Sequence, residues 1–268
     1  MPFLMNTLLS LPVLISASLF VLLIVAISLI SFYAMRRIFG DSNDQETRDL
    51  AGSVLFRIAS LHGLVLALVF AQELENVRAV DLTAAHEASM LGDVFYDLER
   101  YDADITRPIR ISLARYGRAV VDEEWQMLAD SRQLSPTAWS EWEAAYEALL
   151  NLSPATDRQE RLLSIMLGDI RALSELREER ENAALAQTST LFIVAALAGI
   201  LLISAAYFTW APTRINLALI GGFSAYTGLI IYFVVAFSNP YLAPGNSEPN
   251  GFERFLNDDV RALAGQGN

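Results

Sequence analysis

The chain has 268 residues, of which 53% are hydrophobic, and a formal net charge of −12 at pH 7. It contains no cysteine and two histidines, which excludes disulfide bonds and metal centres built from several histidine or cysteine ligands. The acidic balance also excludes nucleic acid as a partner, because neutralising phosphates requires clustered positive charge.

Four apolar segments are each long enough to cross a lipid bilayer. In chain order they cover residues 11–35, 54–72, 191–210 and 215–237. The first is uncharged, closes on Arg36 and Arg37, and is too long for a cleaved signal peptide. Short polar loops join the first two and the last two segments, which predicts two transmembrane hairpins, over residues 1–72 and 188–237. Small residues three or four apart predict close helix approach in the last two spans, at Ala195, Ala198, Gly199, Gly221, Gly222, Ala225 and Gly228.

The region between the hairpins, residues 73–187, is predicted to be an acidic helical domain outside the bilayer. Residues 73–186 hold 23 acidic residues and 12 arginines. The helix of the second span is expected to continue to about Asp102, and further helices to begin at Arg107, Pro136 and Thr156. The last of these is expected to run unbroken into the third span. The predicted fold class is therefore all-α, a polytopic membrane protein with four transmembrane helices around an acidic domain.

Residues 238–268 form a polar tail. A turn-rich stretch precedes one short amphipathic helix carrying Phe252, Phe255, Leu256, Val260 and Leu263. Because surface-binding helices favour basic faces, we expect this acidic segment to dock on the protein and not on the membrane.

Five polar residues of the second span and its exit are candidate pore or interspan residues: Arg57, His62, Gln72, Glu73 and Asn76. A charge within a span is costly, so Arg57 is either an interfacial anchor or part of a pore vestibule or ion pair. His62 either hydrogen-bonds a neighbouring span or changes charge near neutral pH. Glu73 and Asn76 fit a pore mouth and fit a solvated helix start equally well.

Asp122, Glu123 and Glu124 are three consecutive carboxylates. Consecutive positions diverge around a helix, and Arg118 and Asp122 are spaced as a surface pair, so a charged outer face is favoured over acid–base chemistry. The sequence has no phosphate-binding loop, nucleophile motif or metal-ligand spacing. We therefore expect neither an enzyme nor a cofactor.

Several runs resemble the bestrophin-like domain family of mostly bacterial membrane proteins. They are GSVLFRIASLHGLVLALVFAQELENVRAVDLTAAHEASMLGDVFYDL, RYGRAVVDEEW, SPATDRQERLL and the endings NPYLAPG and EPNGFERFL. The most specific is RYGRAVVDEEW, with Arg115, Tyr116, Glu123, Glu124 and Trp125 as the motif residues. The family pattern has an aromatic residue in place of His62 and an uncharged one in place of Arg57. The resemblance therefore implies that neither residue is a family-wide catalytic group.

The resemblance implies a remote relation to bestrophins, pentameric anion channels whose pore is lined by the second span. The leading hypothesis is an oligomeric ion channel in a bacterial cytoplasmic membrane, with lipid, further copies of the chain and ions as partners. Arg36 and Arg37 favour an external acidic domain, whereas the resemblance favours the opposite side, so the orientation stays open. The alternative is a membrane-anchored sensing or scaffolding protein whose acidic domain binds a partner.

Overall fold

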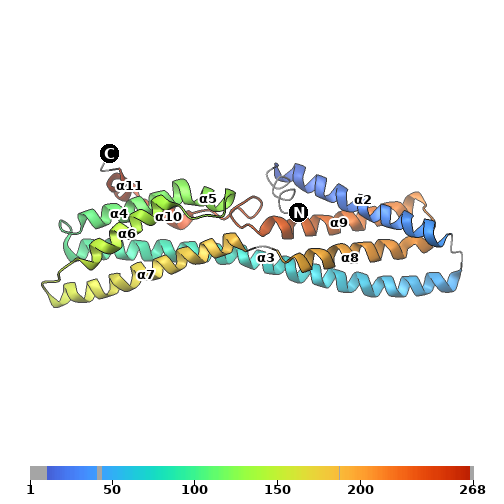
Figure 1. Cartoon of the computed structure of the whole chain (residues 1–268), viewed down its shortest axis with the longest axis horizontal. Helices are drawn as coiled ribbons and strands as arrows, with labels where there is room; N and C mark the ends of the chain where they lie inside the picture. The colour runs from blue at the N-terminus through green and yellow to red at the C-terminus, as the bar shows by residue number, and fades with distance from the viewer. Residues whose placement is uncertain (1–10, 41–43, 187, 266–268) are drawn as a thin grey trace. The chain divides into compact units, whose positions relative to one another are not determined.

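The computed structural model describes residues 11–40, 44–186 and 188–265. All regular elements in these ranges are helices, which confirms the all-α prediction (Figure 1). The chain divides into two compact units. Unit 1 comprises residues 1–75 and 187–238, and unit 2 comprises residues 76–186 and 239–268.

Unit 1 contains α2 (Val13–Phe39), the first part of α3 (Gln45–Asp102), α8 (Thr190–Ala206), a 3₁₀ turn (Tyr207–Thr209) and α9 (Arg214–Phe237). Helix α2 packs against both α9 and α8. The apolar core of unit 1 draws on all four helices and includes Ile24, Leu66, Ala196, Ile200 and Ile231. Three buried serines link α2, α8 and α9, because Ser28 Oγ lies 2.5 Å from Ser204 Oγ and 2.6 Å from Ser224 Oγ.

Four stretches contain, within the described residues, helix long and apolar enough to cross a membrane: Val13–Phe39, Gln45–Asp102, Asp157–Thr209 and Arg214–Phe237. The third comprises two separate helices, α7 and α8, and the 3₁₀ turn that follows, and it includes residue 187, which lies outside the described residues. Helix α3 continues without interruption to Asp102, as predicted. It begins earlier than expected, because the Asp44 carboxylate accepts hydrogen bonds from the backbone N–H and hydroxyl of Thr47 and so caps the first turn.

The predicted unbroken helix from the acidic domain into the third span is wrong. Helix α7 ends at Leu185, Ala186 is extended, and α8 begins at Thr190. Hydrogen bonds made by serine and threonine hydroxyls compete with the backbone hydrogen bonds of a helix. The Thr188 hydroxyl lies 3.2 Å from Glu73 Oε1 and 3.3 Å from the Val234 carbonyl, in unit 1.

Unit 2 contains the rest of α3, α4 (Arg107–Ala119), a π-helical turn η1 (Val120–Glu124), α5 (Trp125–Asp130), α6 (Pro136–Leu150) and α7 (Asp157–Leu185). Two of the predicted helix starts are confirmed with their caps. The Ser135 hydroxyl accepts from Ala138 N–H, and the Thr156 hydroxyl accepts from Gln159 N–H. Proline follows Ser135 directly at the first helical position, where its missing N–H costs nothing.

The tail completes the core of unit 2. It forms two short helices, α10 (Asn250–Phe255) and α11 (Asp258–Ala264), and not the single helix predicted, because Asn257 caps a new helix through Asp259 and Val260 N–H. Phe252 and Val260 are buried among α3 and α4 residues, which confirms docking within the protein. A Cβ on Gly117 of α4 would lie 3.0 Å from the Phe255 ring, so glycine is what allows the tail so close.

Candidate functional site

The five predicted polar residues of α3 lie on different sides of the helix. Arg57, Gln72 and Asn76 are exposed, whereas His62 is 7% and Glu73 8% exposed. Glu73 accepts a hydrogen bond from Thr188, at the start of the α8 segment. His62 packs against Gly199 of α8. The structure therefore does not bring these five residues together.

A second group of polar side chains is brought together, inside unit 2. Glu87 of α3, Glu124 of η1 and Arg177 and Arg180 of α7 are all buried and connected. Arg180 Nε donates to Glu87 Oε2 at 2.5 Å and its Nη2 donates to Glu124 Oε1 at 2.7 Å. Arg177 Nη2 donates to Glu124 Oε2 at 2.5 Å. We call these four residues, with Tyr116, the ionic cluster.

Further contacts surround the ionic cluster, in which Arg180 Nη1 is the guanidinium nitrogen that has no hydrogen-bond partner among the described residues. The Tyr116 hydroxyl donates to Glu87 Oε1. Arg177 Nη2 also donates to the Ser135 carbonyl at 2.8 Å, and Ser135 N–H donates to Glu124 at 3.0 Å. The guanidinium of Arg180 lies 5.3 Å from the Trp125 ring and 5.6 Å from the Phe252 ring, so it is held by aromatic faces as well as carboxylates.

The position of Glu124 corrects the prediction of a charged outer face. Asp122 and Glu123 are exposed as expected, but Glu124 is 0% exposed. The physical reason is the π-helical turn, in which Trp125 N–H bonds to the Val120 carbonyl five residues earlier. In a regular α-helix Glu124 would lie roughly 80° around from Tyr116, whereas absorbing one extra residue brings it to about 20°.

The sequence analysis did not single out Glu87, Arg177 or Arg180 as site residues. A signal for Glu87 was present. It lies midway between Val80 and Val94, seven residues from each, in the buried stripe of α3. A charged residue inside an apolar stripe at helical spacing indicates a buried partner of opposite charge.

The electrostatics of the ionic cluster follow from burial and pairing. Burial disfavours the charged form of Glu124, but the guanidinium groups of Arg180 and Arg177 outweigh it and hold its pKa below the ordinary value. Burial likewise opposes the charge on Arg180, but Glu87 and Glu124 raise its pKa well above the ordinary value. Burial and the neighbouring Glu87 raise the pKa of Tyr116 well above its usual range. Glu124 is thus held ionised against the guanidinium groups of Arg180 and Arg177, which suits clamping of helices and not proton transfer.

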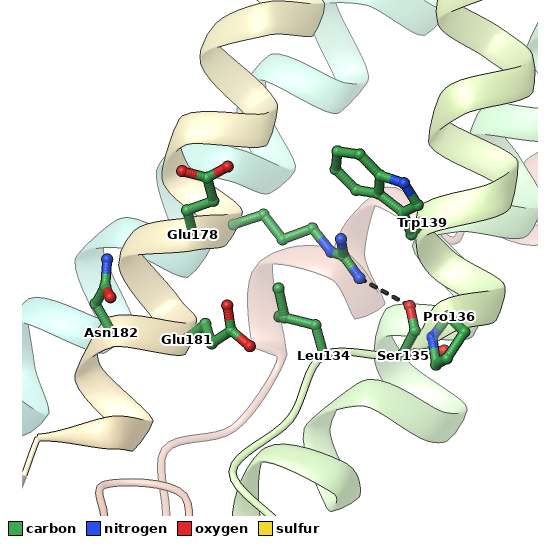
Figure 2. Close-up of a pocket in the computed structure, with 8 residues that line it drawn as sticks. Leu134, Ser135, Pro136, Trp139, Glu178, Glu181 and Asn182 are labelled. Atoms are coloured by element: carbon green, nitrogen blue, oxygen red, sulfur yellow. Dashed lines mark hydrogen bonds between the residues drawn. The ribbon is translucent and has the colours of Figure 1, made fainter.

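A surface pocket of about 390 Å³ lies beside Arg177 (Figure 2). Trp139 of α6 stands on one side, and Glu178 and Glu181 of α7 on the other. Trp139 is stacked on Trp142 at 4.7 Å, and Arg177 covers its ring at 5.4 Å. Both contacts hold the indole in place, and Trp139 remains 40% exposed at the pocket. Among the residues described, no group of three or more His, Asp or Glu side chains could hold a metal ion.

The fold and sequence were compared with known proteins. Crystal structures of a bacterial bestrophin homologue from Klebsiella pneumoniae are similar to this chain, one carrying a point mutation with a TM-score of 0.56 and another with 0.55. Both are 16% identical and cover 92% and 93% of this chain, and 98% and 99% of their own. A crystal structure of a variant of "a membrane protein" has a TM-score of 0.57 at 17% identity, covering 93% of this chain and 99% of its own.

A search of the curated proteins found no match. The bestrophin-like domain matches residues 22–242, a range that includes α2 from its middle, all of α3 to α9 and the ionic cluster. The chain belongs to the bestrophin-like domain family.

Proposed function

We propose that the protein is an oligomeric ion channel of a bacterial cytoplasmic membrane, with its pore along the 54–72 segment of α3. The proposal places residues 1–72 and 188–237 in the bilayer as two hairpins. It places the acidic region 73–187 and the tail 238–268 outside. The family membership and the fold shared with bacterial bestrophin homologues support it.

The observation that carries the proposal is the two-sided character of α3 in unit 1. One side is buried against unit 1 through His62, Leu66 and Glu73. The opposite side is an exposed stripe at helical spacing, defined by Arg57, Leu61, Leu64, Leu68, Gln72 and Glu75. These six positions fall within an arc of about 80°. We call this set the α3 stripe.

The chemistry of the α3 stripe suits conduction. Its ends carry charge, at Arg57 and Glu75, and its middle is three leucines. Charged residues at pore entrances select ions by sign, and apolar constrictions gate by excluding water. A single copy presents only one such stripe, so an enclosed pore requires several copies around an axis.

The test is ion flux through purified protein in liposomes. Leu64→Ala should raise flux several-fold by widening the apolar middle, and Arg57→Gln should shift the reversal potential toward cations. Leu219→Ala, on the exposed face of α9 and outside the α3 stripe, is the matched control and should change neither.

Assembly is tested in parallel. The chain has no cysteine, so a single Leu68→Cys variant should crosslink between copies in membranes. A monomer that shows no flux in chloride, sodium or potassium gradients between pH 5 and pH 8 would overturn the channel. A protein partner that copurifies only when residues 73–187 are present would favour the sensing or scaffolding alternative instead.

A further inference from the structure

His62 sits in a notch of α8 that only glycine can provide. A Cβ built on Gly199 would lie 2.2 Å from His62 Nδ1 and 2.7 Å from its Cε1. Real Cβ contacts do not come so close, so the imidazole occupies the space where any other residue would have its side chain. Gly221 and Gly222 of α9 differ, because a Cβ on either would meet nothing within 4 Å. The fit is therefore specific to the pair His62 and Gly199.

The notch accommodates the imidazole ring but offers it few hydrogen-bond partners. His62 is 7% exposed, and its Nε2 has no hydrogen-bond partner among the residues that the structure describes. One turn further along α3, Leu66 joins an apolar cluster with Ala196 and Ile200, which flank Gly199. The site thus suits a neutral ring.

The charged residues of the helices around His62 lie away from its imidazole ring. Helix α8 has no titratable residue between Thr190 and Ala206. On α3, Arg57 is on the exposed side and Glu73 lies eleven residues further on, bonded to Thr188. The remaining titratable residues of α2 and α9 are at or near helix ends, engaged elsewhere or exposed: Tyr33, Arg36 and Arg37 on α2, and Arg214, Tyr226 and Tyr232 on α9.

From this geometry we infer that His62 is a proton-operated latch between α3 and α8. The neutral imidazole holds the two helices together in the Gly199 notch. A proton on the ring creates a charge without a counter-ion in an apolar setting, which is costly. Moving α3 away from α8 hydrates the ring and removes that cost. Because an unperturbed imidazole takes up its proton near pH 6.5, acid favours the separated arrangement and alkaline pH the packed one.

The inference stands apart from the channel proposal, because its readout is a distance and not a current. Nitroxide labels are placed at Ser60→Cys on α3 and Leu202→Cys on α8, both exposed and within three residues of the pair. The labelled protein is reconstituted in nanodiscs, diluted with unlabelled chain so that only distances within one copy contribute. The absence of native cysteine makes both sites unique. Pulsed dipolar spectroscopy at pH 8 and pH 5 should show a longer distance becoming the major population in acid, reversibly.

Three variants distinguish a latch operated by His62 from a general sensitivity of the protein to acid. His62→Gln, which cannot take up a proton in this range, should hold one distribution at both pH values. Gly199→Ala should give the longer distance at both, because the methyl group displaces the ring. Gly221→Ala is the matched control and should behave as the parent does.

A second measurement covers the case in which the His62 variant fails to fold. Only two histidines are present, and His86 is exposed, so ¹⁵N-histidine spectra of the unmutated protein contain one buried signal and one internal reference. The midpoint of the His62 titration should coincide with that of the distance change. Equal distances at pH 5 and pH 8, or a distance change that does not track the His62 signal, would overturn the latch.

Discussion

At the scale of single residues, the guanidinium of Arg180 is a fully buried charge in unit 2 that requires partners of opposite charge. Its side chain is 0% exposed, and it is shared between Glu87 and Glu124. Two charges of each sign balance within the ionic cluster, so removing one partner leaves a buried carboxylate without compensation. Arg177 still pairs with Glu124 in that case, whereas Glu87 keeps only the hydrogen bond from Tyr116 among the residues that the structure describes.

Arg180→Met should therefore destabilise unit 2 by about 3–5 kcal/mol. The measurement is urea unfolding followed by tryptophan fluorescence, which reports mainly on unit 2, where Trp125, Trp139 and Trp142 lie. Arg161→Met, the same change at an exposed position of α7, should stay within about 0.5 kcal/mol of the parent. Equal stabilities of the two variants would show that the ionic cluster does not hold unit 2 together.

Lowering the pH should change the stability of unit 2 in opposite directions through two carboxylates, Glu124 of η1 and Asp169 of α7. The lowered pKa of Glu124 means that its pairing stabilises the fold above the ordinary value of 4.5 and is lost as pH falls through the lower folded value. Asp169 is the reverse case. Partial burial and the nearby Asp93 and Asp97 raise its pKa, so its ionised form destabilises the fold at neutral pH, and this is relieved as pH falls through the raised value toward 3.8.

Asp169→Asn should thus stabilise unit 2 at pH 7, by less than about 1 kcal/mol because the group is partly solvated. Below about pH 4 the advantage should vanish, since the native carboxyl is then neutral as well. Asp157→Asn, in the first turn of the same helix, should destabilise instead, because it removes a charge that favours the helix dipole. Urea unfolding at pH 7 and pH 4 distinguishes these results, and a destabilised Asp169→Asn protein at pH 7 would contradict the assignment.

At the scale of elements, local signals predicted most of the helices. The caps at Ser135 and Thr156 and the length of α3 were all readable, because each depends on residues a few positions apart. The π-helical turn at Val120–Glu124 could not be predicted locally, because it allows Glu124 to pair with Arg177, which is 53 residues away. The small-residue spacing of the spans was informative in part. A Cβ added to Gly228 would lie 3.0 Å from Ile24 Cβ, so this glycine allows close packing. A Cβ added to Gly221 or Gly222 would have no atom within 4 Å.

The buried serines of unit 1 could not be paired from sequence, because they lie on three helices far apart in the chain. Ser28→Ala should weaken the packing of α2 on α8 and α9 by about 0.6 kcal/mol, and up to about 1.7 kcal/mol, since it removes both contacts of the Ser28 hydroxyl. Ser18→Ala is the control, because Ser18 is exposed and bonds only to Leu14 of its own helix. Unfolding in mixed detergent micelles gives both values, and an unchanged Ser28→Ala protein would mean that apolar packing alone holds the three helices.

At the scale of the whole molecule, each unit draws on segments from distant parts of the chain. Unit 2 is closed by the tail, since Tyr241 donates to the Arg180 carbonyl and the Ser247 carbonyl accepts from Trp125 Nε1. The acidic character of the tail predicted that it would dock on the protein. The contact between Phe252 and Arg180 could not be predicted, because hydrophobic periodicity carries no information about which distant surface a helix meets.

Removal of residues 239–268 should therefore loosen unit 2 and leave unit 1 intact. The loss of Phe252 and Val260 exposes apolar surface of α3 and α4 and uncovers one face of Arg180. Hydrogen-exchange mass spectrometry should show faster exchange over α4 and residues 87–98, with α2 and α9 unchanged. Phe252→Ala should show the same pattern more weakly, at a cost of about 3–5 kcal/mol, and exposed Glu253→Ala should show none. If exchange accelerates equally in α2 and α9, the two units unfold as one, and the ionic cluster then contributes to the stability of the membrane helices as well.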